Sequence, residues 1–290
     1  VGMGLDLYRN SPTARQVFEQ ADQVLDMPLS KLCFEGPEEE LRQTINAQPA
    51  IMMASVACLK AAQEHNHPPT PAFTAGHSLG EYTALVAAGA LSFTEALRLV
   101  RERGRLMQEA GQATPGGMAA IIGLDRASVE KVCLESGAHI ANLNSREQIA
   151  ISGSKEAIEK AMALAKAMGA KRAIPLQVSG AFHCCLMQSA VAGMAEAISK
   201  TAFSPPKVPV VANSTVEPLT TADAVKEELL RQLCNCVNWH PTVEYMIQNG
   251  VSTFVEIGPG RVLTGLIKRI DENAQVFNIS DMTSVKSVDL

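Results

Sequence analysis

The chain has 290 residues, of which 47% are apolar and 19% charged, so it can bury a sizeable core and is expected to be globular. Its formal net charge of −5 at pH 7 argues against nucleic-acid binding, and its longest apolar runs are too short or interrupted for the ~20 residues of a membrane span. Seven cysteines, an odd number, indicate free thiols in a reducing, cytoplasmic setting rather than a disulfide framework.

Helical and strand-like patterns alternate along the first part of the chain. Ser11 and Pro12 are typical of a helix start and predict a helix to about residue 24. Pro49 predicts a second helix, which begins there and ends near residue 64. The apolar run 71–76 predicts a strand, followed by helices over 82–88 and 94–107. This alternation predicts an α/β fold.

The order of elements changes after residue 117. Strand and helix patterns follow as strand, helix, strand, strand, helix, strand, over 118–122, 126–136, 139–142, 148–152, 155–168 and 171–176. This is the order of a ferredoxin-like unit. We therefore expect an inserted subdomain over 115–179 and a discontinuous, α/β-hydrolase-like large domain with a parallel sheet, over 1–114 and 180–290. The tail 282–290 has little periodicity and is expected to be mobile.

The residues from Gly76 to Gly80 read Gly-His-Ser-Leu-Gly and match the G-x-S-x-G pattern between a predicted strand and a predicted helix. There a sharp turn would lift the Ser78 hydroxyl out of the end of the sheet, toward the first N–H groups of the helix. The two glycines are expected to permit the tight backbone. Ser78 is a candidate nucleophile, and an ordinary turn with a capping serine is the alternative.

A serine nucleophile needs a base, and histidine is the usual one. His183 is the best candidate of the six histidines, because it follows the second domain junction, where the returning chain can reach the turn at Ser78. His77 adjoins the serine but is expected to point elsewhere, as a packing or hydrogen-bonding neighbour. The others are expected to be solvated or to lie at the starts of elements: His65, His67, His139 and His240.

A hydrolase triad also needs a carboxylate between the serine and the histidine in chain order. Six acids of that interval lie on predicted helical faces or turns of the subdomain, where solvated charges are expected: Asp125, Glu130, Glu135, Glu147, Glu156 and Glu159. The expected acid is therefore not evident. Its absence weakens an esterase interpretation and indicates a neutral acceptor, such as a main-chain carbonyl, behind the imidazole.

Arg103 lies on the apolar stripe of the helix predicted after the turn, with apolar residues three and four positions away on both sides. A guanidinium that points inward is costly unless it meets a carboxylate or phosphate. Arg103 is therefore expected to bind either an internal acid or the carboxylate of an acyl group on Ser78. No metal is expected, because the cysteines at 184–185 and 234–236 lack the paired spacing of a zinc site.

Along its whole length, the sequence resembles the malonyl-CoA:acyl carrier protein transacylases of bacterial type II fatty-acid synthesis. The matching segments are 76–82, 103–108, 142–144, 180–183, 231–233, 256–260 and 262–265. The resemblance implies transfer of a malonyl group from a coenzyme A thioester to the phosphopantetheine thiol of acyl carrier protein, through a malonyl-serine ester, to supply fatty-acid elongation. No cofactor is expected, and we expect a monomer.

The resemblance also implies catalytic roles. Ser78 would carry the malonyl group, His183 would act as its base, and the main-chain carbonyl of Gln232 would orient the imidazole. The Leu79 N–H would bind the oxyanion. Members of the family supply a second oxyanion N–H from a Gly-Gln-Gly-Ser-Gln loop, and this sequence starts after that loop, so we expect lower activity from the chain as given.

The substrate-binding residues follow from the same resemblance. Arg103 would hold the malonate carboxylate, and Phe182 is typical of a preference for malonyl over methylmalonyl groups. His77 and Asn144 complete the expected set. A basic patch for the acidic carrier protein is expected among a few lysines and arginines: Arg146, Lys171, Arg172, Lys268 and Arg269.

Two alternatives remain open at this point. A serine esterase or thioesterase would use the same nucleophile but discharge it to water, and an acidic third member without an inward arginine would favour it. A carrier-binding remnant without turnover is the other, because the oxyanion loop is absent from the sequence as given.

Overall fold

The structure is a computed structural model that describes residues 1–66 and 70–288, so the predicted loop histidine His67 lies outside the described residues. Helices and small sheets alternate as the sequence predicts for an α/β fold. Helices dominate the N-terminal part: α1 (Leu5–Asn10), α2 (Pro12–Leu25), α3 (Leu29–Glu35), α4 (Glu38–Arg42), α5 (Thr44–Asn66), α6 (Gly80–Ala87) and α7 (Phe93–Ala113).

Two of these helices test the predicted starts. Helix α2 begins as predicted, with the Ser11 hydroxyl accepting from the Ala14 N–H and proline in the first position. Helix α5 begins at Thr44, earlier than predicted, and includes Pro49. Proline has no N–H for the carbonyl of Ile45, four residues before it. That carbonyl accepts instead from Nη1 of Arg101, at 2.9 Å, and the helix continues through the proline.

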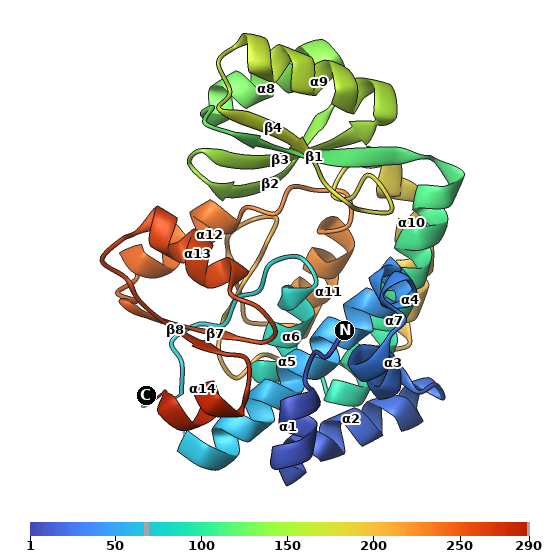
Figure 1. The fold of residues 1–290 in the computed structure, drawn as a ribbon, viewed down its shortest axis with the longest axis vertical. Coiled ribbons are helices and arrows are strands. Elements are labelled where there is room, and N and C mark those ends of the chain that lie inside the picture. The colour runs from blue at the N-terminus through green and yellow to red at the C-terminus, as the bar shows by residue number, and fades with distance from the viewer. Residues whose placement is uncertain (67–69, 289–290) are drawn as a thin grey trace.

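The middle of the chain forms a four-stranded antiparallel sheet with the order β2-β3-β1-β4. Its elements follow the predicted order: β1 (Gly116–Ile122), α8 (Arg126–Ser136), β2 (His139–Ser145), β3 (Gln148–Ser154), α9 (Lys155–Ala167) and β4 (Arg172–Pro175). Figure 1 shows this sheet at one end of the molecule, with α8 and α9 on its outer face. The sheet and its helices enclose an apolar cluster of their own, which includes Ile121, Val132 and Ile151.

The parallel sheet predicted for the rest of the chain consists of short pieces. The described residues there form an antiparallel pair, β5 (Val210–Val211) with β6 (Pro218–Leu219), and a parallel pair, β7 (Thr253–Ile257) with β8 (Gln275–Ile279). The predicted strand 71–76 is a single parallel bridge between Thr74 and Val210. Pro71 has no N–H to donate and the turn begins at Gly76, so little chain remains to pair.

The C-terminal half adds a 3₁₀ turn, η1 (Cys185–Met187), and the helices α10 (Gln188–Ser199), α11 (Ala222–Arg231), α12 (Trp239–Gln248), α13 (Val262–Ile270) and α14 (Met282–Ser287). The prediction of a mobile tail is wrong for residues 282–288. Asp281 and Ser284 form a reciprocal capping box that starts α14, and Val285 is fully buried. The Met282 N–H also donates to the Asp6 carboxylate, which fastens the tail to α1.

The described residues contain no helix that is both long and apolar enough to cross a bilayer.

The subdomain is joined to the segment after α11, because Val237 donates to the carbonyl of Ala141 and accepts from the Leu143 N–H, each at 2.9 Å. This pairing ties the edge strand β2 to the segment that follows α11 and its C-cap, Gln232.

Candidate active site

The turn between Thr74 and α6 holds Ser78 in a left-handed backbone conformation, with φ of 53°. For a residue with a side chain this conformation is strained, and it persists only where the surroundings fix it. Ser78 remains partly exposed, so a substrate can reach its hydroxyl. The turn is therefore the sharp bend that the G-x-S-x-G pattern predicts.

Only one of the two glycines is required by close packing. A Cβ at Gly76 would lie 2.0 Å from the backbone carbon and oxygen of Gly80, whereas a Cβ at Gly80 would meet nothing within 4 Å. The expectation that both glycines permit the tight backbone is therefore right for Gly76 and wrong for Gly80.

A matched pair of alanine substitutions tests this difference. Gly76→Ala is expected to destabilise the fold by ~3 kcal/mol, because backbone atoms cannot yield as a side chain would. Gly80→Ala is expected to raise stability by ~0.5–1 kcal/mol, because it replaces a glycine in the first turn of a helix. Thermal unfolding of the two variants measures both effects, and equal midpoints would contradict the steric argument.

Ser78 and His183 meet as predicted, although 105 residues separate them. His183 Nδ1 lies 2.9 Å from the main-chain carbonyl of Gln232, and Nε2 lies 2.7 Å from the Ser78 Oγ. A carbonyl only accepts, so Nδ1 carries the proton and Nε2 is free to accept from the serine hydroxyl. The arrangement is that of a base poised to deprotonate a nucleophile.

The carbonyl behind His183 lies at a helix terminus. Gln232 is the C-cap of α11, where unpaired carbonyls concentrate the negative end of the helix dipole. A neutral acceptor can therefore stabilise the imidazolium that forms when His183 takes a proton. Among the described residues, none of the six subdomain acids considered above bonds to this histidine.

His183 itself is buried and adopts a left-handed conformation, with φ of 59°. Its burial, together with the charge of Arg103, lowers the pKa of His183 to about 3. The imidazole is therefore neutral, and able to accept a proton, throughout the physiological range.

Arg103 points inward as predicted and is only 1% exposed. Its Nη2 lies 3.2 Å from the Ser78 Oγ and 2.8 Å from Oε1 of Gln232, and its Nη1 donates to Oε1 of Gln48. The guanidinium carbon lies 5.6 Å from the centre of the Tyr82 ring. Among the described residues, no carboxylate lies within ion-pair distance of Arg103, so the alternative of a direct internal ion pair is not supported.

The surroundings of Arg103 suit a ligand that carries a negative charge. Burial lowers its pKa, and its Nε has no hydrogen-bond partner among the described residues. A buried cation held by neutral amide oxygens gains much from an incoming carboxylate, since attraction between charges is stronger away from water.

The remaining predicted residues lie at different distances from the nucleophile. The Leu79 N–H, next to Ser78 at the start of α6, bonds to no acceptor among the described residues and is available to an oxyanion. His77 bonds through Nε2 to Oδ1 of Asn144, at 2.8 Å, and links the turn to β2. Phe182 packs against the inner face of the subdomain, on Met118 and its neighbours.

The sequence does not predict three groups that support the turn, two of them by direct hydrogen bonds to Ser78. Asn213 accepts from the Ser78 N–H, the Glu81 carboxylate is completely buried behind it, and the side chain of Gln232 donates to the Ser78 carbonyl. Glu81 had a detectable signal, because it lies one residue before the predicted helix 82–88 and four residues before the apolar Leu85, a spacing that places it on the inward face. Asn213 lies 135 residues from Ser78, and no signal in the sequence indicates their contact.

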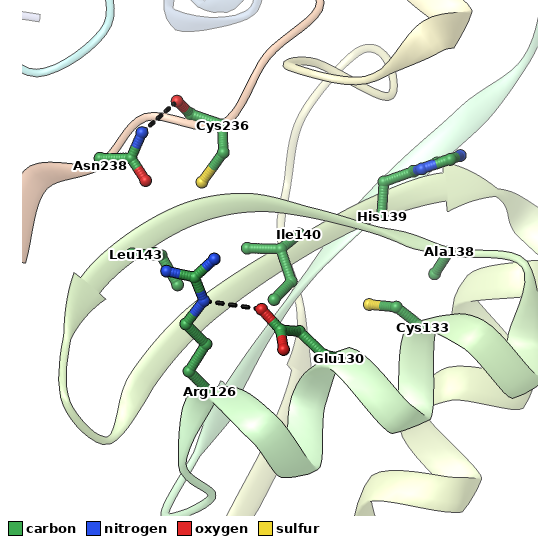
Figure 2. Close-up of a pocket in the computed structure, with 9 residues that line it drawn as sticks. All are labelled: Arg126, Glu130, Cys133, Ala138, His139, Ile140, Leu143, Cys236 and Asn238. Carbon is green, nitrogen blue, oxygen red and sulfur yellow. Dashed lines mark hydrogen bonds and ion pairs between the residues drawn. The ribbon is translucent and has the colours of Figure 1, made fainter. Parts of the chain in front are cut away.

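A cavity of about 260 Å³ lies elsewhere, between α8, β2 and the segment 236–238, and Figure 2 shows its lining. Its lining includes Cys133, His139 and Cys236 but none of the residues around Ser78. No cluster of three or more potential metal ligands occurs among the described residues.

Comparisons with known proteins agree with the resemblance noted in the sequence. The acyl transferase domain family matches residues 1–288. The malonyl CoA-acyl carrier protein transacylase of Bacillus subtilis is 45% identical, over 99% of this chain and 91% of that protein. An acyl carrier protein S-malonyltransferase from Vibrio cholerae has a TM-score of 0.96 at 42% identity, and the match covers 100% of this chain and 95% of that one.

A further solved structure holds a malonyl-transacylase in complex with a type II PKS acyl-carrier protein. It has a TM-score of 0.95 at 45% identity, with 98% of this chain and 93% of that chain covered. The agreement covers the subdomain as well as the helices and strands around Ser78. This chain therefore belongs to the acyl transferase domain family and is related along its whole length to the malonyl CoA-acyl carrier protein transacylases.

Proposed function

We propose that this chain is an acyltransferase that moves a malonyl group from malonyl-CoA to the phosphopantetheine thiol of acyl carrier protein, and so supplies fatty-acid elongation. One observation carries the proposal: the Ser78 hydroxyl lies 2.7 Å from a neutral imidazole and 3.2 Å from a buried guanidinium that pairs with no carboxylate in the described part of the chain. That combination suits an acyl group with a negative charge of its own. An esterase for uncharged acyl groups has no need of the guanidinium beside its serine.

In the first step, His183 takes the Ser78 proton as Oγ attacks the thioester carbonyl of malonyl-CoA. The carbonyl oxygen becomes an oxyanion beside the Leu79 N–H. The tetrahedral intermediate collapses, the carbon–sulfur bond breaks, and His183 returns the proton to the departing thiolate of coenzyme A. The product is a malonyl ester of Ser78, with its free carboxylate on Arg103.

In the second step, the carrier thiol takes the place of coenzyme A. His183 removes the thiol proton, the sulfur attacks the ester carbonyl, and the carbon–oxygen bond to Ser78 breaks as the proton passes to Oγ. Arg103 holds the ester in register for this attack, which favours the bound thiol over water. Neither step needs a metal or a redox cofactor.

The basic patch is proposed as the surface that receives the acidic carrier protein. Arg146 lies in the turn between β2 and β3, Lys171 bonds to Glu147 in the same turn, and Arg269 of α13 donates to Gln148. Arg172 pairs with the end of β1, beside this turn. Together with Lys268, these basic side chains form a cluster where the subdomain meets α13. Such a patch speeds association with an acidic partner.

Incubation with radiolabelled malonyl-CoA tests the function. We expect a stable ester on Ser78 that disappears when acyl carrier protein with its phosphopantetheine arm is added. Ser78→Ala should remain unlabelled. Release of free malonate would indicate a hydrolase, and the absence of any label would indicate a carrier-binding remnant.

We propose the finer domain description on the order of elements. The strand order β2-β3-β1-β4 with two helices on one face fits a ferredoxin-like subdomain over 115–179. The segments 1–114 and 180–290 then form the α/β-hydrolase-like large domain, whose apolar cluster is separate from that of the subdomain.

A cytoplasmic monomer is the proposed state of the chain. All seven cysteines are free, which suits a reducing compartment. Among the described residues, large exposed apolar side chains are few and, apart from Leu176 and Val178 in one loop, lie in different segments, as in monomers: Val1, Ile51, Leu134, Met168, Leu176, Val178 and Val262.

A further inference from the structure

Glu81 is completely buried in the first turn of α6, and among the described residues its carboxylate bonds to neither Ser78 nor His183. Its Oε1 accepts from the main-chain N–H of Asn213, at 2.9 Å, and its Oε2 accepts from Nε2 of Gln232, at 2.5 Å. The Asn213 N–H can only donate, and the Gln232 amide presents its NH₂ to Glu81 because its oxygen accepts from Arg103. The site is therefore built for a group that accepts hydrogen bonds on both oxygens.

The first partner fastens the nucleophile. The side chain of Asn213 accepts from the Ser78 N–H and donates to the Gly76 carbonyl, each at 2.7 Å. These two bonds bridge the bend on either side of His77 and hold Ser78 in its strained conformation. Since Glu81 holds the backbone of Asn213, it fixes the position of this bridge.

The second partner connects the other functional groups. Nε2 of Gln232 also donates to the Ser78 carbonyl, at 2.9 Å, and Oε1 of the same amide accepts from Nη2 of Arg103. The amide can face Arg103 with its oxygen only because its nitrogen faces acceptors, one of which is Glu81. The main-chain carbonyl of this residue accepts from His183. One residue thus contacts the nucleophile, the base and the guanidinium.

We propose that Glu81 is a positioning residue for acyl transfer, which acts through Asn213 and Gln232 to hold Ser78 in its reactive conformation. The inference rests on the proposed role of Ser78 as nucleophile. Glu81 also lies near the buried charge of Arg103, and a carboxylate at this place offsets that charge without occupying the face that a substrate needs.

Three other polar groups face Glu81. Burial and the neighbouring carboxylate of Glu228 raise the pKa of Glu81, whereas Arg103 opposes that rise. Tyr82 lies beside it on α6 and interacts electrostatically with both carboxylates. Glu228 holds the N–H and the hydroxyl of Ser214, and its carboxylate also faces the main-chain N–H of Asn213, which bonds to Glu81.

Glu81→Gln and Glu228→Gln form a matched pair that separates positioning from general stability. An amide at position 81 must turn its NH₂ toward an N–H donor, either of Asn213 or of Gln232, and one hydrogen bond is lost. An amide at position 228 can donate to the Ser214 hydroxyl, which reverses freely, and its other atom still accepts from the main chain. Both variants remove one buried carboxylate, but only E81Q turns an NH₂ group toward an N–H donor of the relay.

We expect single-turnover acylation by malonyl-CoA to slow about 10- to 100-fold in E81Q, since small displacements of reacting groups cost about this much. The malonyl-CoA concentration for half-maximal rate should stay within about threefold, because Arg103 keeps its contacts with Gln48 and Tyr82. In E228Q, the rate should stay within about threefold of the unmodified chain.

Asn213→Ala provides a second test should E81Q fail to fold. It removes the bridge directly and should slow acylation by malonyl-CoA and by acetyl-CoA to the same degree, because it displaces Ser78 and leaves Arg103 in place. An unchanged rate in E81Q, or an equal loss in E81Q and E228Q, would overturn the proposal, as would an unchanged rate in Asn213→Ala. Failure of the proposed function would be distinguishable from failure of this proposal, because the unmodified chain would then form no ester on Ser78.

Discussion

Replacing Arg103 with alanine is expected to lower kcat/KM for malonyl-CoA by about 10²- to 10³-fold, while acylation by acetyl-CoA changes less than about tenfold. The guanidinium is 1% exposed and 3.2 Å from the Ser78 hydroxyl, so a malonyl carboxylate would pair with it away from water. Acetyl-CoA has no carboxylate and loses no such pairing. Rates of ester formation on Ser78 with the two donors measure this selectivity.

Two further variants control for changes in packing. Arg103→Met keeps much of the side-chain volume and should show the same selectivity as Arg103→Ala. Arg98→Ala removes an arginine from the same helix. Its side chain is 59% exposed and pairs with Glu95 at 3.5 Å, far from the nucleophile in the contacts of the described residues, so acylation should not change. Equal losses for malonyl-CoA and acetyl-CoA in the Arg103 variants would contradict the carboxylate-binding role.

Local patterns in the sequence predict much of this fold. The boundaries of α2 and α8 and the order of strands and helices in the subdomain follow from capping residues and periodicity, which act over a few positions. The inward direction of Arg103 follows from helical spacing in the same way. Ser78 is predictable because the bend needs a short, specific pattern.

Long-range contacts account for what the sequence does not predict. The early start of α5 depends on Arg101, which satisfies the carbonyl that Pro49 leaves without a donor. The bridge from Asn213 to Ser78 joins residues 135 positions apart, and nothing in either neighbourhood signals it. Helix α14, at the tail, is too short for its sequence to show helical periodicity. It depends on a capping box and on a hydrogen bond from the Met282 N–H to Asp6, at the other end of the chain.

Replacing His183 with asparagine is expected to slow acylation of Ser78 by about 10²- to 10⁴-fold, the usual contribution of a general base. The asparagine amide can still donate to the Gln232 carbonyl, which limits the structural damage, but it cannot accept the serine proton. His139→Asn is the matched control, since this exposed histidine bonds only to the thiol of Cys185 among the described residues and should leave the rate unchanged.

The pH dependence distinguishes a base in this environment from an ordinary histidine. Because burial and the Arg103 charge lower the pKa of His183 to about 3, acylation should keep its rate well below pH 6.5. Once a malonyl carboxylate neutralises Arg103, one cause of the low pKa is removed, so transfer from the ester to the thiol should lose rate at a higher pH than acylation does. If both half-reactions lost rate at the same low pH, the result would contradict the effect of the Arg103 charge on the pKa of His183.

The same pKa shift predicts how stability changes with pH. Between its ordinary pKa of 6.5 and about 3, the unfolded chain binds a proton at His183 that the folded chain does not. The free energy of unfolding should therefore fall as the pH drops through this window, with up to about 1.4 kcal/mol per pH unit from this group. Denaturant unfolding of the unmodified chain and of His183→Asn isolates the contribution of His183. Because asparagine does not titrate, the free energy of unfolding should change less steeply with pH in the variant. Parallel slopes would mean that His183 has the same pKa in the folded and the unfolded chain, and would contradict the lowered pKa in the folded chain.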